Sequence, residues 1–114
     1  MPDCLFCKIA SGNIPTDFVY EDEEIVAFHD INPQAPVHLL VIPREHIATL
    51  LDTSPEHAAL LGRIQQTAID LARSLNLDET GFRLVTNCLE GGGQAVFHLH
   101  LHLLGGRQMN WPPG

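Results

Sequence analysis

Three histidines alternate with leucines near the C-terminus, in the segment FHLHLHLLGG. Side chains of a β-strand point alternately to its two faces, so this spacing predicts a strand with His98, His100 and His102 on one face and leucines on the other. A helix would distribute the same histidines around its axis. The leucines give the strand an apolar side on which another layer can pack.

The three imidazoles favour a functional site over an exposed strand face or a stray metal-binding patch. Imidazole acts as acid, base, nucleophile or metal ligand near neutral pH. Side chains two positions apart on a strand are separated by about 6.6 Å, and those four apart by about 13 Å. Nitrogens on one tetrahedral zinc lie roughly 3.3 Å apart. Two neighbouring histidines can therefore share an ion, and at least one is left for another role.

Length and charge restrict the class of protein. The 114 residues suffice for one domain with a core, which we expect to span residues 1–114. A net charge of −8 with only six Lys and Arg argues against nucleic acid as partner, whereas backbone amides and histidines can hold a single phosphate. The sequence has no transmembrane run and no signal peptide, so we expect a cytoplasmic protein with reduced cysteines and no membrane contact.

Shorter patterns predict the other elements. Apolar runs bounded by turn residues predict four more strands, at residues 16–20, 25–28, 37–42 and 82–86. A short helix over residues 4–11 is expected to stop at Gly12. Apolar residues at helical spacing predict a long helix after Ser54 as N-cap, with Asn76 as its C-terminal cap. Short turns between the strands favour antiparallel pairing with the long helix on one face, an α+β domain.

A glycine-rich loop directly precedes the histidine segment. The run of three glycines that ends at Gly93 lets the backbone approach a ligand closely. The amide of Gln94 is expected to face the same place, with Asn87 across the loop. Donors that converge beside an imidazole suit an anionic phosphoryl group. Three glycines alone are more often a flexible turn, but their position before the histidines favours a binding loop.

Cys4 and Cys7 have the spacing of two zinc ligands, and such a site requires two more. His46 and His98 are the candidates. Two buried free thiols explain the spacing of the cysteines equally well.

Three residues near the middle of the chain carry weaker signals. His38 opens an apolar strand, where it either orients His100 or is a hydrogen-bonded core histidine. His29 precedes a loop and contacts either a ligand or only water. Asp30 either accepts hydrogen bonds from a ribose diol or caps the loop.

These motifs together resemble the histidine triad (HIT) superfamily of nucleotide hydrolases and transferases. HLHLHLL matches the His-x-His-x-His signature, and the similarity covers nearly the whole chain, through CLFCKIASGNIPT, FHDINPQAPVHLLVIPREHI and GGGQAVFHLHLHLLGGRQMNWPPG. The C-terminal GGRQM and WPPG resemble the histidine triad nucleotide-binding (Hint) branch. The resemblance implies a five-stranded antiparallel sheet with two helices, and a homodimer with one continuous ten-stranded sheet.

The resemblance also implies a purine nucleoside phosphoramidase, which hydrolyses the P–N bond between AMP or GMP and an amine such as that of lysine. His100 would be the nucleophile and form a nucleotidyl-histidine that water cleaves. His102 and His38 would bind or orient around the phosphate and His100, and His98 would support them through its backbone. Imidazole suits this role, because it is a good nucleophile and, once protonated, a good leaving group. The chemical step requires no metal.

The same resemblance implies a nucleotide-binding set. Phe28 and Ile31 would line the base pocket, and Asp30 would bind the ribose hydroxyls. Trp111 of the partner subunit would shape the leaving-group side. The other contacts to the nucleotide would come from His29, Asn87, Gly93, Gln94, Ala95, His100 and His102.

Two further features follow from the resemblance. Cys4, Cys7, His46 and His98 match the zinc-binding members, which implies a closed, structural zinc site. The family usually has a hydroxyl or other polar residue where this chain has Ala95. If that residue protonates the departing amine, turnover here is slower or substrate preference is shifted.

Two alternative functions stay open at this point. One is a dinucleotide polyphosphate hydrolase, which substrate competition would distinguish. The other is a nucleotide-binding or scaffolding protein with incidental hydrolysis, which tight AMP binding with negligible turnover would favour.

Overall fold

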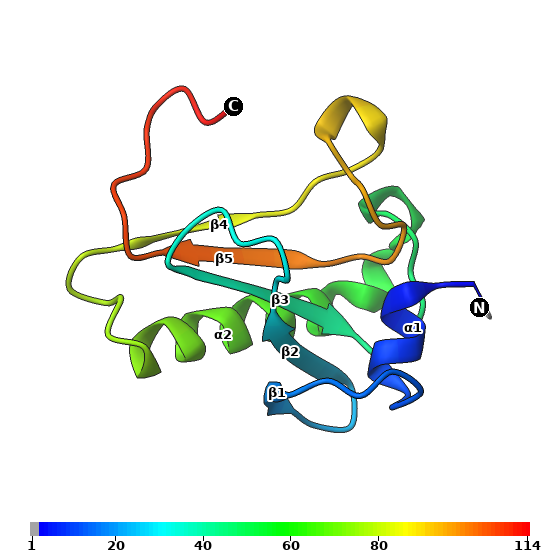
Figure 1. Ribbon diagram of the computed structural model, residues 1–114. Coiled ribbons are helices and arrows are strands. Elements are labelled where there is room, and N and C mark those ends of the chain that lie inside the picture. The colour runs from blue at the N-terminus through cyan, green and yellow to red at the C-terminus, as the bar shows by residue number, and fades with distance from the viewer. Residues whose placement is uncertain (1–2) are drawn as a thin grey trace.

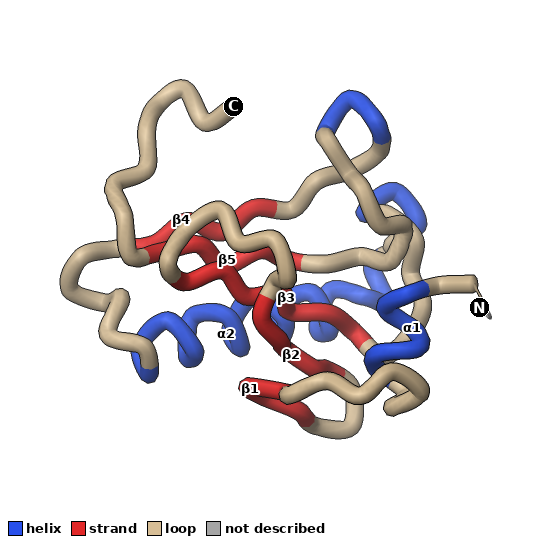
Figure 2. Tube along the Cα trace, in the orientation of Figure 1, coloured by secondary structure: helices blue, strands red, loops and turns tan. Residues whose placement is uncertain are grey.

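The computed structural model describes residues 3–114, which form one sheet and two α-helices. Helix α1 spans Leu5–Ala10 and α2 spans Ala58–Ser74. The strands are β1 (Phe18–Glu21), β2 (Ile25–His29), β3 (Val37–Pro43), β4 (Phe82–Val85) and β5 (Leu101–Gly105). All neighbours pair antiparallel, in the order β1-β2-β3-β5-β4 (Figures 1 and 2). The predicted α+β fold is confirmed.

The two faces of the sheet are covered by different helices. Strands β2 and β3 are continuous apolar runs, and both of their faces are buried. Helix α2 lies along one face (Figure 1), where Ile64 and Ala68 pack against Leu101. On the opposite face α1 contributes Phe6, which packs against Phe28. Burial of a large side chain such as Ile64 or Phe6 contributes about 1.5–3 kcal/mol. The part of the second face beside α1 carries the polar side chains described below.

The long helix begins later than predicted as an α-helix. Ser54 is followed by a 3-10 turn, η2 (Pro55–His57), and α2 starts at Ala58. The main-chain N–H of Ser54 donates to Nδ1 of His57 at 3.0 Å, which ties the turn to its own cap. At the other end Asn76 has a φ of 62°, the left-handed conformation expected of a residue that ends a helix.

The histidine strand is shorter than predicted, because β5 begins at Leu101 and contains only His102 of the three histidines. Continued pairing with β3 would bring the chain opposite Pro43, which has no N–H to donate. The N–H of Leu99 donates instead to the carbonyl of Ile47 at 2.6 Å. The leucines that alternate with the histidines are nevertheless buried, as the pattern predicts.

Two glycines end β5 at positions where a side chain would not fit. A Cβ at Gly105 would lie 2.6 Å from the side chain of Leu77. Gly106 has a φ of 88°, and a Cβ there would lie 2.9 Å from Pro36. The C-terminal segment thus leaves the sheet in contact with the loop that precedes β3.

Within residues 3–114, no helix combines the length and the apolar character needed to cross a bilayer.

Candidate active site and adjoining metal centre

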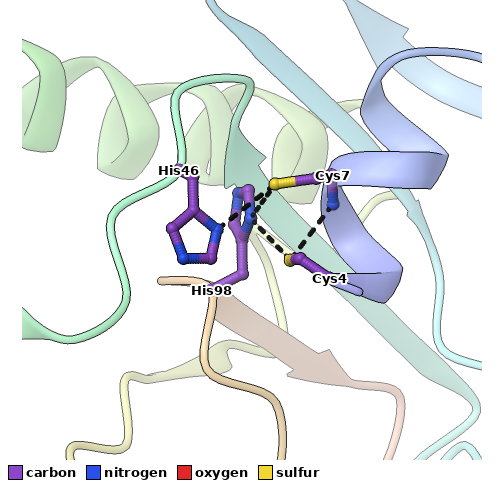
Figure 3. A group of neighbouring side chains, drawn as sticks. All are labelled: Cys4, Cys7, His46 and His98. Atoms are coloured by element: carbon purple, nitrogen blue, oxygen red, sulfur yellow. Dashed lines mark hydrogen bonds between the residues drawn. The ribbon is translucent and has the colours of Figure 1, made fainter. Parts of the chain in front are cut away.

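Four predicted metal ligands converge beside α1. Cys4 and Cys7 lie at the start of α1, His46 follows β3, and His98 precedes β5 (Figure 3). The Cys4 Sγ is 3.3 Å from Nδ1 of His98, and the Cys7 Sγ is 3.2 Å from Nδ1 of His46 and 3.5 Å from that of His98. The four ligand atoms all lie within 4.8 Å of one another, so the structure brings the predicted set together.

The ring orientation of His98 suits a metal ligand. Its Nε2–H donates to the carbonyl of Pro43 at 2.7 Å, so Nδ1 presents a lone pair to the two sulfurs. A main-chain partner on the far nitrogen is usual for metal-binding histidines. Burial lowers the pKa of His98, which keeps its imidazole neutral.

The spacing and donor types also suit a tetrahedral ion. Bonds of about 2.0 Å to nitrogen and 2.3 Å to sulfur place neighbouring ligands close to the observed 3.2–3.5 Å. Burial, and then the adjacent Cys4 thiol, raise the pKa of Cys7, so this thiol ionises readily only beside a cation. A set of two thiolates and two imidazoles has no open position, which is the structural type of centre.

His100 lies next to this centre with one ring nitrogen committed. Its Nδ1–H donates to the main-chain carbonyl of His98 at 2.7 Å. In the neutral ring Nε2 therefore carries the lone pair. The imidazole is buried and packs edge-to-face against Phe6 at a centroid distance of 5.2 Å. His98 thus offers its side chain to the candidate metal site and orients His100 through its main chain.

His38 and His102 form a second contact on the sheet face opposite α2. Nε2 of His38 is 2.9 Å from Nδ1 of His102, and the ring centroid of His102 lies 4.9 Å from that of His100. The carboxylate of Asp30 approaches Nε2 of His38 at 3.4 Å.

Both of these imidazoles are neutral near pH 7. Burial lowers the pKa of His38 in spite of the opposing effect of Asp30. Burial, and then the positive charge that His100 and His38 would carry when protonated, lower the pKa of His102 to about 4.

One polar atom of this cluster has no partner among the described residues. Nε2 of His102 is buried and makes no hydrogen bond, whereas its Nδ1 is occupied by His38. Leaving a buried polar group unpaired costs about 1–3 kcal/mol. The His102 ring lies beside His100. Nε2 of His100 presents a lone pair that is able to act as a nucleophile. A ligand that offers both an electrophilic centre and an acceptor oxygen would satisfy both rings.

A model of the HIT domain matches residues 11–109 of the chain. The chain belongs to the HIT family. It is 53% identical to a HIT-like protein of Synechococcus elongatus, over 98% of this chain and 97% of that protein. It is 50% identical to a 14 kDa zinc-binding protein of Brassica juncea, over 98% and 100% of the two chains.

Solved structures of the HIT family share the fold. A HIT family hydrolase from Legionella pneumophila superposes with a TM-score of 0.96 at 58% identity, over 98% of this chain and 100% of that one. A histidine triad nucleotide-binding protein from Candida albicans gives a TM-score of 0.81 at 32% identity, over 96% and 83%. The predicted family is thereby confirmed, and the chain is similar to HIT family hydrolases.

Gln94 is placed differently from the prediction. Its Oε1 accepts from the N–H of Leu89 at 2.8 Å, and its Nε2 donates to the carbonyls of Ala48 and Val96 at 2.7 and 3.1 Å. Main-chain carbonyls use both hydrogens of this amide, so in this structure the side chain has no hydrogen left for a ligand. Gln94 instead fixes the glycine-rich loop, in which Gly93 has a φ of 82°.

The other residues predicted for this HIT protein's nucleotide site differ widely in burial. Phe28 is buried in the core against Phe6, so it does not line an open base pocket in this structure. Ile31 and Trp111 are 99% and 83% exposed, so neither packs against the site within this chain. His29 at the end of β2 and Ala95 are exposed, and Asn87 is half-buried.

Three contacts in the site were not predicted from the sequence. They are the Phe6 ring against His100, the Pro43 carbonyl on His98, and a hydrogen bond from the Gln34 N–H to His38. Two of them are made by main-chain atoms, and such contacts cannot be recognised from the residue type. Phe6 had one available signal, its position between the two cysteines in CLFC.

Proposed function

We propose that this HIT family protein hydrolyses purine nucleoside phosphoramidates through a nucleotidyl-histidine intermediate. The observation that carries the proposal is the pair formed by His100, whose Nε2 has a free lone pair, and His102, whose buried Nε2 has no partner among the described residues. A phosphoryl group can satisfy both, because its phosphorus accepts the lone pair and its oxygens accept a hydrogen bond.

The first displacement forms a bond between Nε2 of His100 and phosphorus while the P–N bond breaks and the departing amine takes up a proton from solvent water. Nδ1 of His100 keeps its proton, so the adduct is an imidazolium, and its bond to the His98 carbonyl becomes charge-assisted. In the second displacement water attacks phosphorus and the N–P bond to His100 breaks. One proton of the water is released, the nucleoside monophosphate leaves, and His100 returns to its neutral state.

The surrounding residues would supply binding rather than covalent chemistry. A proton on Nε2 of His102 would donate to a phosphoryl oxygen, in the manner of an oxyanion hole. Asp30 would bind the ribose, and Ile31 beside it the base, since both lie in the loop after β2. Ala95 offers no proton to the departing amine.

The test compares hydrolysis of adenosine 5′-phosphoramidate by the parent and by His100→Ala. We expect turnover to fall roughly 10⁴-fold or more, because removal of a nucleophile commonly costs this much. His57→Ala is the matched control, since His57 lies in the turn before α2 and contacts Ser54 and Glu45. Parent-level activity in His100→Ala would overturn the proposal.

We also infer that Cys4, Cys7, His46 and His98 hold a structural zinc ion. The inference is supported by their convergence and by the similarity to a protein named as zinc-binding. Bound zinc would tie α1 to the segment that orients His100, and the reaction at phosphorus would not use it.

We further propose that the active form is a homodimer in the cytoplasm. Two observations support a second copy. Strand β4 is an edge of the sheet, paired only with β5, and Trp111 in the C-terminal segment is 83% exposed. An unpaired edge is a usual site for pairing between chains.

A further inference from the structure

The loop before β3 contacts the site through its main chain. The N–H of Gln34 donates to Nδ1 of His38 at 3.0 Å. Because Nδ1 accepts this bond, the proton of the neutral His38 ring is on Nε2. The carboxylate of Asp30, 3.4 Å from Nε2, favours the same tautomer.

The tautomer of His38 determines that of His102. With its proton on Nε2, His38 donates to Nδ1 of His102 across 2.9 Å. Nδ1 of His102 must then be the unprotonated nitrogen, so the proton of its neutral ring is on the unpartnered Nε2. This chain of hydrogen bonds makes the free nitrogen a donor, as an anionic oxygen requires.

The opposite tautomers would reverse this polarity. If His38 carried its proton on Nδ1, its Nε2 would be an acceptor, and His102 would have to place its proton on Nδ1 to bond with it. The free Nε2 of His102 would then present a lone pair to a phosphoryl oxygen, which is repulsive. The hydrogen bond from the Gln34 N–H is therefore required for a phosphoryl oxygen to bind favourably at Nε2 of His102, both in the ground state and in the transition state.

A second segment holds Gln34 in place. Nε of Arg107 donates to the main-chain carbonyl of Gln34 at 3.0 Å, and Nη1 of Arg107 donates to the carbonyl of Gln108 at 3.1 Å. The preceding Gly106 packs against Pro36 of the same loop. Gln34 is exposed, so water competes for its main chain wherever the loop moves away from His38.

We propose that Arg107 and the main-chain N–H of Gln34 are positioning groups that set the tautomers of His38 and His102. This role rests on the proposed phosphoryl-transfer function for its effect on rate. The tautomers themselves are a property of the protein without substrate.

The experiment reads the imidazole tautomers by long-range proton–nitrogen NMR of the full ¹⁵N-labelled chain at pH 7. In the parent we expect both His38 and His102 to carry their proton on Nε2. Gln34→Pro removes the donor, and Arg107→Ala removes the brace without altering that donor. Both variants are expected to raise the population of the Nδ1–H form at His38, against the remaining effect of Asp30, and kcat is expected to fall about five-fold or more, the effect of losing one ordinary hydrogen bond.

Two controls separate this role from a general loss of structure. Gln34→Ala keeps the main-chain N–H and is expected to keep both tautomers. Arg83→Ala removes an arginine that holds the same C-terminal segment, through the carbonyl of Asn110 at 2.8 Å, and it too is expected to keep them. If Gln34→Pro does not fold, the Arg107→Ala variant still tests whether these groups set the tautomers.

The proposal is overturned if His38 of the parent carries its proton on Nδ1, or if Arg107→Ala changes neither the tautomers nor kcat. Absence of phosphoramidate hydrolysis in the parent would overturn the proposed function. The NMR result would still decide the tautomers.

Discussion

Each histidine of the FHLHLHLL segment has one ring nitrogen committed to a partner, and this determines what the other nitrogen can do. His98 donates from Nε2 to a carbonyl, which leaves Nδ1 for a metal. His100 donates from Nδ1, which leaves the lone pair of Nε2 available for a nucleophilic attack. His102 contacts His38 through Nδ1, which leaves Nε2 for a ligand. Three identical side chains two residues apart are therefore suited to three different chemical roles.

The depressed pKa of His102 predicts a pH dependence of stability. Its folded pKa of about 4 is below the value of about 6.5 expected in the unfolded chain. Between these values the unfolded state binds a proton that the folded state does not. Stability is therefore lost as the pH falls from about 6.5 to about 4, by about 2–3 kcal/mol for this residue.

The measurement is the unfolding free energy in urea at pH 7.5 and pH 4.5, at one protein concentration, for the parent and His102→Asn. We expect the parent to lose more stability than the variant over this interval, by about 2 kcal/mol. An equal loss in the two proteins would show that His102 is not held neutral by burial.

At the scale of elements, much of the fold was predictable, because its causes are local. Continuous apolar runs predicted β2 and β3, and Asn76 marked the end of α2. The start of β5 was not predictable from the alternation of His and Leu. It depends on Pro43 of another strand, which cannot extend the ladder.

The candidate site, like the fold, was predictable only in part. The set of metal ligands followed from CxxC spacing and the histidine pattern, and the structure brings its four members together. The direction of the Gln94 amide was not predictable, since it depends on carbonyls contributed by Ala48 and Val96. Side-chain type thus predicts which residues gather, while main-chain partners decide how each is used.

The proposed metal centre would join α1 to the segments that follow β3 and precede β5, so its loss should affect the whole chain. We expect Cys7→Ser to lose bound zinc, measured by elemental analysis of the purified protein, and to lower the unfolding free energy by at least about 2 kcal/mol. Cys88→Ser, a free cysteine outside the cluster, is the control and should retain zinc. Parent protein without bound zinc would contradict the inference.

At the scale of the whole molecule, two features of the described residues are open to a second subunit. A hollow of about 150 Å³ lies between α2 and the segment leading into β5, and it is lined largely by apolar side chains, among them Leu61, Ile64 and Leu99. The C-terminal segment extends away from the sheet after β5 (Figure 1), and its Trp111 is 83% exposed. These features are those expected of a dimer in which each subunit completes the site of the other.

Mixed dimers test whether Trp111 acts in the partner's site. His100→Ala dimers should be inactive and Trp111→Ala dimers impaired. When the two variants are unfolded together and refolded, each mixed dimer contains one site with His100 intact and an intact Trp111 from the other subunit. We expect phosphoramidate hydrolysis to exceed the sum of the separate proteins. Simple additivity would place Trp111 in its own subunit's site or outside any site.

The central claim is that Nε2 of His100 attacks phosphorus, and the most direct test is the mass of the protein during turnover. The parent is mixed with adenosine 5′-phosphoramidate, quenched at short times without acid, and its intact mass and peptides are measured. We predict an added adenylyl group located on His100, absent from His100→Ala. Hydrolysis at the full rate with no adduct at any time, or with the adduct on another residue, would contradict the account.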